Sequence, residues 1–419
     1  MADEQTERDG PSRREYVKWG GAVVGGGLLA GCIGGGSTPT DTPADADDGT
    51  GDTAETPTRT ATQTATATAS DASTRTATET ATATATPEET PYSVTMEPVG
   101  TVEFDEVPET WFPYTADWAD MGVALGESDG LAAIGVRARF GTHLYEDLPG
   151  VSVDRSELTQ LWQDGTGKEV FYELDADVHV VDPNFVINRL GWSEGDVEEI
   201  RNQVAPFFGN TVFSRAYGWH DYADYSLYEA FEKLARLFRK EDRYEAFEQY
   251  HDEVLADVEA RLPDETPDIA VLYPAGVPPE SFYPYLVGAG TQSKHWNDLQ
   301  VGDALAKHGI TDAQAGGSTV DFETLLEIDP DALAIRLQGE VTDEYFQNEI
   351  VAHLEDHEIA SELTAVQDDR VVYGGLTYQG PVIHLFQLEA AAQGLYPDEF
   401  GGEQLFDRQR VADIVDGDI

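Results

Sequence analysis

Residues 117–136 read DWADMGVALGESDGLAAIGV and predict a helix followed by a buried strand. Trp118, Met121 and Leu125 recur at the spacing of one helix face, and Gly126 ends the helix. The apolar run LAAIGV that closes the stretch has the length and composition of a buried strand. A helix and a strand in such close succession are typical of α/β proteins.

The same alternation continues through the rest of the folded part. We predict strands over residues 110–113, 176–181, 269–273, 332–335 and 370–373. We predict helices over residues 168–174, 296–308, 322–327 and 381–393. Glycine and proline separate these segments, and the second half repeats the order of the first. The pattern therefore predicts an α/β fold with two Rossmann-like lobes and mainly parallel sheets.

A long helical pattern lies between the two halves. Apolar residues recur at helical spacing from Leu227 to Leu262, and Pro263 ends the pattern. We predict one long backbone helix over residues 226–262, between an N-terminal lobe (93–225) and a C-terminal lobe (263–419). The charged run RKED at 239–242 leaves a two-helix hairpin as the alternative.

The charge of the chain limits its partners. The 419 residues include 25 Lys and Arg against 80 Asp and Glu, which gives a formal net charge of −55. A nucleic-acid surface or an anionic lipid surface would require clustered cations, so we expect neither partner. Such acidity suits a halophilic protein, because salt at 1 M screens charges within about 3 Å.

The N-terminus, residues 1–32, has the features of an export signal. Arg13 and Arg14 precede an aromatic and an aliphatic residue, which resembles the twin-arginine signal. The apolar stretch 19–33 is too short to span a bilayer comfortably. It ends in LAGC, which resembles a lipobox and implies a lipid on Cys32, the one cysteine of the chain. We expect export by the twin-arginine route and anchoring to the outer face of the cell membrane.

Residues 33–92 have the composition of a disordered linker. They are rich in Thr, Ala and Asp, and no aromatic residue occurs between Cys32 and Tyr92. Such a segment cannot bury enough apolar surface to offset its ordering entropy. We expect a stalk that holds the folded lobes near the membrane, with threonines suited to O-glycosylation.

Five stretches, taken together and in order, resemble one protein family. Besides residues 117–136 they are KEVFYELDADVHVV (168–181), STVDFETLLEIDPDALAI (318–335), LTAVQDDRVVYGG (363–375) and GLYPDEF (394–400). They resemble the substrate-binding proteins of ABC importers for ferric siderophores and cobalamin, the class with a helical backbone. Two positions depart from the family pattern, since Ala176 replaces a Pro and Asp321 replaces a Ser.

The resemblance implies a transport component rather than an enzyme. It implies a monomer that captures an iron(III) chelate of the ferric siderophore type and delivers it to an ABC permease served by a cytoplasmic ATPase. Cobalamin or haem on the same scaffold, or a divalent metal ion, are the alternatives. The resemblance also implies that Glu169 and Glu323, one in each repeated box, dock onto the permease.

Ligands of such folds bind beyond the carboxyl ends of parallel strands. The loops at those ends supply the predicted ligand-binding residues Trp111, Tyr114, Phe140, His143, Tyr145, Trp219, Tyr273, Tyr283, Arg336 and Tyr378. The same loops also carry Asp182, His220, Tyr285 and Tyr373. This set is rich in rings and poor in acids, which suits a large organic chelate. Arg336 could bind an anionic oxygen of that chelate.

Histidines leave a metal site open as an alternative. His353 and His357 have ligand spacing on a helix, although acidic residues surround them. His143, His220 and His295 could also converge on a bare metal ion. The usual motifs of serine hydrolases, phosphate-binding loops and zinc proteases do not occur in the sequence, so we expect no enzyme. An adhesive surface protein would explain the anchor and the stalk but not the two-lobe repeat.

Cys32→Ser tests the anchor. Without the thiol no lipid can be attached, so we expect the variant to appear in the medium or to remain unprocessed. Fractionation of cells expressing either chain measures this. An unprocessed-to-mature ratio and a membrane fraction equal to those of the parent chain would contradict the prediction.

Overall fold

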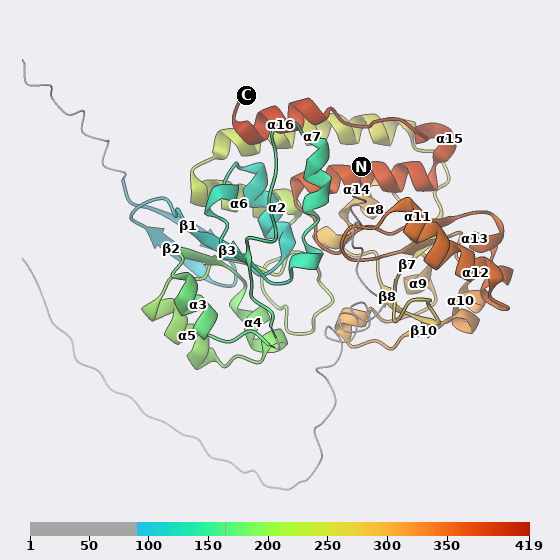
Figure 1. Ribbon diagram of the computed structural model, residues 1–419, viewed down its shortest axis with the longest axis horizontal. Coiled ribbons are helices and arrows are strands. Elements are labelled where there is room, and N and C mark those ends of the chain that lie inside the picture. Colours follow the sequence, from blue (N-terminus) through green and yellow to red (C-terminus); the bar gives the residue numbers. More distant parts are fainter. Residues whose placement is uncertain (1–89, 164) are drawn as a thin grey trace, which may run out of the picture. The chain divides into compact units, whose positions relative to one another are not determined.

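The computed structural model describes residues 90–163 and 165–419 (Figure 1). The predicted export signal, Cys32 and the stalk up to residue 89 lie outside the described residues, and their roles stay predictions. Tyr92, at the end of the predicted stalk, already belongs to a strand. Within the described ranges, no helix combines the length and apolar character needed to cross a membrane.

The N-terminal lobe is built on short parallel strands. They are β3 (Trp111–Pro113), β4 (Ala133–Ile134), β5 (Thr159–Gln160) and β6 (Val178–Val180), and they pair as β3 with β6 and β4 with β5. The Ala132 N–H donates to the Trp111 carbonyl at 2.9 Å and joins the two pairs. In the resulting order β5-β4-β3-β6, the chain adds β4 and β5 on one side of β3 and β6 on the other. Open α/β sheets bind ligands at such a switch in strand order.

A hairpin and four helices complete this lobe. The hairpin consists of β1 (Tyr92–Met96) and β2 (Gly100–Phe104), which pair antiparallel. The helices are α2 (Ala116–Ala124), α3 (Glu169–Leu174), α4 (Pro183–Leu190) and α5 (Glu194–Gln203). The sequence predicted α2 and α3 but not the hairpin, α4 or α5.

The C-terminal lobe has a mixed sheet of order β10-β8-β7-β11-β12. Its strands are β7 (Asp268–Pro274), β8 (Ser281–Tyr285), β9 (Gly302–Asp303), β10 (Val320–Asp321), β11 (Ala332–Ile335) and β12 (Val371–Tyr373). β7, β11 and β12 run parallel, and β9 also pairs parallel with β7. β8 is antiparallel to both of its neighbours. The α/β fold class is confirmed, with β8 and β10 as an antiparallel edge.

The helices of the C-terminal lobe follow the predictions in part. They are α8 (Lys294–Asp298), α9 (Ala304–Lys307), α10 (Phe322–Ile328), α11 (Asp343–Phe346), α12 (Ala352–Asp356), α13 (Thr364–Gln367), α14 (Pro381–Leu395), α15 (Pro397–Phe400) and α16 (Arg408–Asp416). The single helix predicted over 296–308 is wrong. The chain there forms α8 and α9, because Gly302 and Asp303 leave the helix to pair with β7.

The prediction of a single backbone helix over 226–262 is also wrong, and the alternative of a two-helix hairpin is confirmed. The chain forms α6 (Leu227–Phe238) and α7 (Glu241–Arg261), separated by Arg239 in the left-handed region at φ 54°. Phe231 of α6 packs on Tyr244 and Phe247 of α7, with ring centroids 5.5 and 6.0 Å apart. Folding back buries the apolar face of α6 against α7, which a straight helix could not do. α7 alone leads on to β7.

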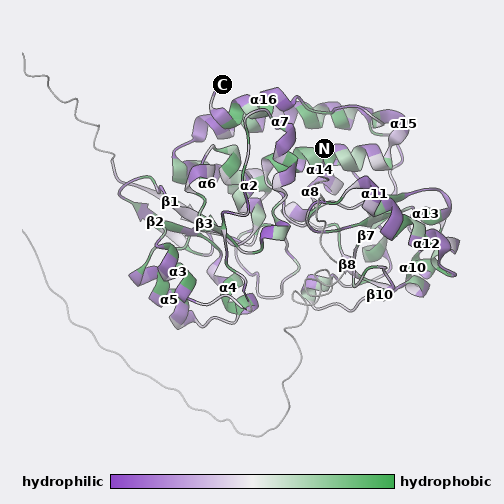
Figure 2. Ribbon diagram, in the orientation of Figure 1, coloured by the Kyte–Doolittle hydropathy of each residue, from purple (hydrophilic) through white to green (hydrophobic). Residues whose placement is uncertain are grey.

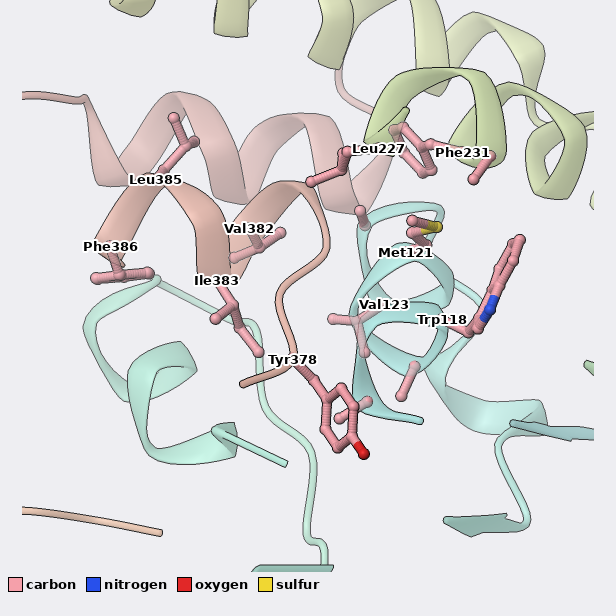
Figure 3. Close-up of a cluster of buried hydrophobic side chains, with 14 of the residues drawn as sticks. Trp118, Met121, Val123, Leu227, Phe231, Tyr378, Val382, Ile383, Leu385 and Phe386 are labelled. Carbon is pink, nitrogen blue, oxygen red and sulfur yellow. The ribbon is translucent and has the colours of Figure 1, made fainter. Parts of the chain in front are cut away.

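The main core lies where α2, α6 and α14 meet. Figure 3 shows Val123 of α2 facing Val382 and Ile383 of α14, with Leu227 and Phe231 of α6 beside them. These side chains are almost fully buried. Hydrophilic residues predominate on outer helices such as α5 and α16 (Figure 2).

A buried carboxylate joins α2 to the first turn of α14. Asp120 Oδ2 accepts the Val382 and Ile383 N–H groups at 3.1 and 2.9 Å, and Oδ1 accepts the Tyr145 hydroxyl at 2.6 Å. The N–H groups of a first helical turn have no partner within the helix, so this contact satisfies two of them. Burial outweighs these hydrogen bonds and raises the pKa of Asp120 to about 7.

The pKa of Asp120 predicts a pH dependence of stability. An unfolded aspartate titrates near about 3.9, so between about pH 4 and pH 7 the native state binds more protons than the unfolded state. The free energy of unfolding should therefore fall as the pH rises through this window. Each unit of pKa shift corresponds to about 1.4 kcal/mol. Asp120→Asn removes the titrating group, so it should reduce the fall in the free energy of unfolding by a few kcal/mol. Urea titrations of both chains at pH 4.5 and 7.5, in equal salt, measure the free energy of unfolding at each pH.

Asp129→Asn is the matched control for this experiment. Asp129 is exposed and lies shortly after α2, so its replacement should leave the pH dependence unchanged. Identical pH dependence in the Asp120→Asn and parent chains would show that Asp120 does not titrate in this range.

Candidate functional site

A cavity of about 880 Å³, a figure that includes space open to solvent, lies at the carboxyl ends of strands from both lobes. Tyr114 follows β3, Arg139 follows β4 and Trp162 follows β5. Tyr378 follows β12 of the other lobe. The complete lining is Tyr114, Val136, Arg139, Trp162, Phe185, Arg189, Leu190, Phe213, Tyr217, Tyr273, Tyr283, Tyr285, Gln314, Gln338, Thr377 and Tyr378.

The antiparallel strand β8 supplies phenol groups to one wall. Tyr283 lies directly opposite Tyr273 of β7, and Tyr285 lies two residues further along β8. Side chains alternate along a strand, so Tyr283 and Tyr285 share the face that lines the cavity. Phe282, the residue before Tyr283, points the other way and is buried in the core of the C-terminal lobe.

Aromatic rings from the two lobes meet in the cavity wall. Phe185 of α4 packs on Tyr114 and Phe213, at 5.3 and 6.1 Å between ring centroids. The ring of Tyr378 then contacts Phe213 edge to face at 5.0 Å. The wall is thus continuous from the N-terminal lobe to the loop before α14, and Figure 3 shows Tyr378 at the end of that loop.

Five tyrosines of the cavity are neutral hydrogen-bond donors. Burial raises the pKa of Tyr285 to about 12, and it also raises the pKa of Tyr114, Tyr217, Tyr273 and Tyr378 above their ordinary range. Each of these phenols therefore keeps its proton at neutral pH and can donate it to an oxygen of a ligand.

Two guanidinium groups accompany these phenols. Burial disfavours the charged form of Arg139, but the phenols of Tyr378, Tyr285 and Tyr273 outweigh burial, so the pKa of Arg139 is raised. Arg189 lies with its Cζ atom 5.3 Å from the ring centroid of Tyr217. Both side chains line the cavity and both come from the N-terminal lobe.

None of the described carboxylates lines this surface. Among the residues that the structure describes, those lining the cavity include no Asp, Glu, His or Cys, although the chain contains 80 acidic residues. The cavity therefore combines positive charge, phenol donors and ring faces. Such a surface favours an anionic ligand with flat or apolar parts.

The structure brings four of the predicted ligand-binding residues into the lining: Tyr114, Tyr273, Tyr283 and Tyr378. Trp219 does not line the cavity but stacks on Tyr217, which does, with ring centroids 4.9 Å apart. His143 is partly buried and does not line the cavity. Whether the four tyrosines contact a ligand stays a prediction.

Four other predicted residues lie inside the protein and not on the cavity. Trp111, Phe140 and Tyr145 are fully buried, and Tyr145 donates its hydroxyl to Asp120. Arg336 is 1% exposed, donates to the Gln292 carbonyl and lies behind Tyr285. Burial lowers its pKa to about 10. We no longer propose these four as ligand contacts. Position at a strand end does not fix the direction of a side chain.

Sequence reasoning missed both arginines of the lining as well as Trp162 and Tyr217. Arg139 and Trp162 follow strands β4 and β5, so the strand-end rule could have selected Arg139 from the predicted strand 131–136. Arg189 lies on α4, and Tyr217 lies in the long segment between α5 and α6. Neither element was predicted from the sequence.

The two glutamates of the repeated boxes occupy equivalent exposed positions. Glu169 is the first residue of α3, and Glu323 is the second residue of α10. The placement of each in a first helical turn agrees with the prediction, while docking itself stays a prediction.

The histidine pair at 353 and 357 is already engaged within the protein. His353 Nε2 lies 2.9 Å from the Pro279 carbonyl, and His357 Nδ1 accepts the Ile359 and Ala360 N–H groups. In residues 90–163 and 165–419, no three His, Cys, Asp or Glu side chains form a group that could hold a metal ion. None of His143, His220 and His295 lines the cavity.

The fold resembles known solute-binding proteins. It resembles the iron uptake ABC transporter substrate-binding protein PiuA from Streptococcus pneumoniae, at a TM-score of 0.51 and 15% identity, covering 72% of this chain and 98% of that one. It also resembles the petrobactin-binding protein YclQ from Bacillus subtilis, at a TM-score of 0.53 and 14% identity, covering 74% of this chain and 99% of that one. The heme binding protein HmuT is similar at a TM-score of 0.51 and 16% identity, covering 74% of this chain and 92% of that one.

A comparison of the sequence with curated proteins finds no match. The model of one family, described as periplasmic binding protein, matches residues 118–376, which run from α2 of the N-terminal lobe past β12 of the C-terminal lobe and include most of the residues that line the cavity. The chain therefore belongs to the periplasmic binding protein family and is a solute-binding transport component, not an enzyme.

Proposed function

We propose that this chain captures an anionic iron(III) chelate of the ferric siderophore type outside the cell and delivers it to an ABC permease. The observation that carries the proposal is a cavity whose described lining residues supply phenols and two arginines but no carboxylate or imidazole. A chelate that carries excess negative charge fits such a surface. Its rings or methylenes would pack on Tyr and Phe faces, and its oxygens would accept from Arg139 and the phenols.

A bare divalent ion fits this cavity poorly. Zinc and manganese sites need several converging imidazole, thiolate or carboxylate donors. Neutral phenols of raised pKa are weak ligands for such ions, whereas a chelate brings its own donor set to the iron. The protein then has to supply only ring contacts, hydrogen bonds and charge.

Similar folds support this class of ligand. YclQ is described as a petrobactin-binding protein, PiuA as an iron uptake protein and HmuT as a heme binding protein. Haem is the second candidate for this chain, because its propionates are anionic and its ring is flat. Cobalamin carries no excess negative charge, so it matches the positive charge of this cavity less well.

The rest of the proposal concerns position and delivery. The chain is exported through its twin-arginine signal, held to the membrane by lipid on Cys32 and separated from it by the Thr-rich stalk. It acts as a monomer and docks onto its permease through Glu169 and Glu323. The matching placement of these two glutamates in exposed first turns supports this role.

Arg139→Gln tests the choice of ligand. Two probes, a ferric tris-catecholate with net negative charge and a neutral ferric tris-hydroxamate, are titrated into the full chain. Quenching of tryptophan fluorescence reports binding, since Trp162 lines the cavity. We expect the variant to bind the anionic probe about 1.5–3 kcal/mol more weakly, or roughly ten- to a hundredfold. Its affinity for the neutral probe should change far less.

Arg137→Gln is the matched control. Arg137 lies two residues away, donates Nε to the Leu158 carbonyl at 2.7 Å and does not line the cavity. Its replacement should leave both affinities unchanged. Stoichiometric binding of free Zn²⁺ or Mn²⁺ by the parent chain, with no response to either probe or to haem, would reject the proposed function.

A further inference from the structure

One buried cation lies behind the cavity wall of the C-terminal lobe. Arg336 directly follows β11, is 1% exposed and does not itself line the cavity. Burial lowers the pKa of its guanidinium to about 10, so the group still carries its charge at neutral pH. A full charge inside a protein costs stability unless its surroundings satisfy it, so the contacts of Arg336 need an explanation.

An ion pair does not provide that explanation. In the part of the chain that the structure describes, the guanidinium donates to one residue, Gln292, through Nη2 to the main-chain carbonyl and through Nη1 to the side-chain oxygen. Its Nε atom has no hydrogen-bond partner among the described residues. The carboxylate of Asp312 favours the charged form of Arg336 without forming an ion pair with it, and it already accepts the Leu286 and Gln314 N–H groups.

Gln292, the residue that Arg336 holds, contacts lining residues of both lobes. Its N–H donates to the Phe213 carbonyl of the N-terminal lobe at 3.2 Å. Its side-chain amide pairs with that of Gln314, at 3.2 and 3.3 Å between nitrogen and oxygen. Phe213 and Gln314 both line the cavity. Through Gln292, Arg336 therefore fixes one lining residue of each lobe.

The two lobes are closely fitted at this junction. A Cβ atom on Gly290 would lie 2.2 Å from the Phe213 carbonyl oxygen, so a residue without a side chain is needed there. The Thr291 N–H donates to the Val212 carbonyl at 2.9 Å, beside the hydrogen bond of Gln292. The lobes thus meet through two adjacent main-chain hydrogen bonds, and Arg336 holds the residue that makes one of them.

Arg336 also acts on a phenol of the wall. Its Cζ atom lies 5.3 Å from the ring centroid of Tyr285, which lines the cavity. A cation over a ring face is attracted to the π electrons, which holds the ring in place. The same charge stabilises negative charge at the phenol oxygen, so the Tyr285 hydroxyl is a stronger donor to an anionic ligand.

We propose that Arg336 is a positioning residue of the cavity, which fixes Phe213 and Gln314 through Gln292, strengthens Tyr285 as a donor and so makes the cavity selective for anionic ligands. The inference rests on the proposed function, because it assumes that a chelate binds in this cavity. Arg336 does not touch the ligand. It adds a third positive charge to those of Arg139 and Arg189, in a buried place where salt screens it less than an exposed charge.

Arg336→Met and Arg336→Lys, made in the full chain, separate the charge from the hydrogen bonds. Only Lys keeps the charge, and neither residue keeps the flat fork that holds Gln292. Quenching of tryptophan fluorescence gives the affinities for the anionic ferric tris-catecholate and the neutral ferric tris-hydroxamate. We expect Arg336→Met to weaken binding of the anionic probe by about thirtyfold and of the neutral probe by about threefold. Arg336→Lys should weaken both by about threefold and keep the affinity ratio of the parent chain.

Arg243→Met is the matched control for these variants. Arg243 also donates to main-chain carbonyls, those of Leu125 and Asp416, but none of these three residues lines the cavity. Its replacement should leave both affinities unchanged. Equal weakening of both probes by Arg336→Met would reduce Arg336 to a structural residue and overturn the proposal. Should circular dichroism show that Arg336→Met does not fold, parent affinities for both probes in Arg336→Lys would overturn it instead.

A double-mutant cycle tests whether the charge acts through Tyr285. Tyr285→Phe keeps the ring and removes the donor. Arg336→Met should then weaken the anionic probe about threefold less in the Tyr285→Phe chain than in the parent chain, because the donor that the charge strengthens is already absent. Equal weakening in the two chains would reject Tyr285 as the route by which the charge reaches the ligand.

Failure of this inference and failure of the proposed function give different results. A parent chain that binds the anionic probe, together with an Arg336→Met chain that binds it equally well, rejects the inference and leaves the proposed function intact. A parent chain that binds neither probe nor haem rejects the proposed function and this inference with it.

Discussion

The contact between α2 and α14 is the constraint on which the cavity depends. Tyr114 lies two residues before α2, and Tyr378 lies three residues before α14, so both walls are loops that lead directly into these helices. Asp120 of α2 binds the first N–H groups of α14, and apolar packing surrounds this contact. Any movement of one helix along the other would shift Tyr114 relative to Tyr378. The separation of the walls is therefore fixed by core packing and one buried carboxylate.

Charge is distributed unevenly between the surface and the cavity. The chain carries a net charge of −55, yet the cavity presents Arg139 and Arg189 and no acid among its described lining residues. An acidic surface repels anions at long range, so a cavity that binds one must supply local donors at short range. Salt supports this arrangement, because it screens the distant acids more strongly than the hydrogen bonds inside the cavity. The proposed anionic chelate follows from this contrast.

Much of the fold could be predicted from the sequence because local patterns determine it. β11 has the bounds predicted from its apolar run ALAI, and α2 begins one residue before the predicted start. β8 was missed because Pro284 within it argues against a strand, and tertiary pairing with β7 and β10 overrides that preference. The break at Arg239 likewise depends on α6 folding back onto α7, a long-range contact that a periodic pattern does not encode.

The site was less predictable than the fold. Strand ends located the region of the cavity, but the direction of each side chain depends on packing around it. Arg336 follows β11 yet turns inward to the Gln292 carbonyl, while Arg139 after β4 lines the cavity. Tyr273 and Tyr283 were selected as strand-end residues, and both line the cavity because they lie opposite one another on one face of β7 and β8.

Hydrogen exchange on the full chain, with and without a ferric tris-catecholate, tests the central claim that one ligand binds to both lobes at once. Residues 136–140 represent the N-terminal wall, and residues 374–380 represent the C-terminal wall. The account predicts that the chelate slows exchange in both segments over the same range of concentration. Protection of one segment alone, with no change in the other at saturation, would contradict it.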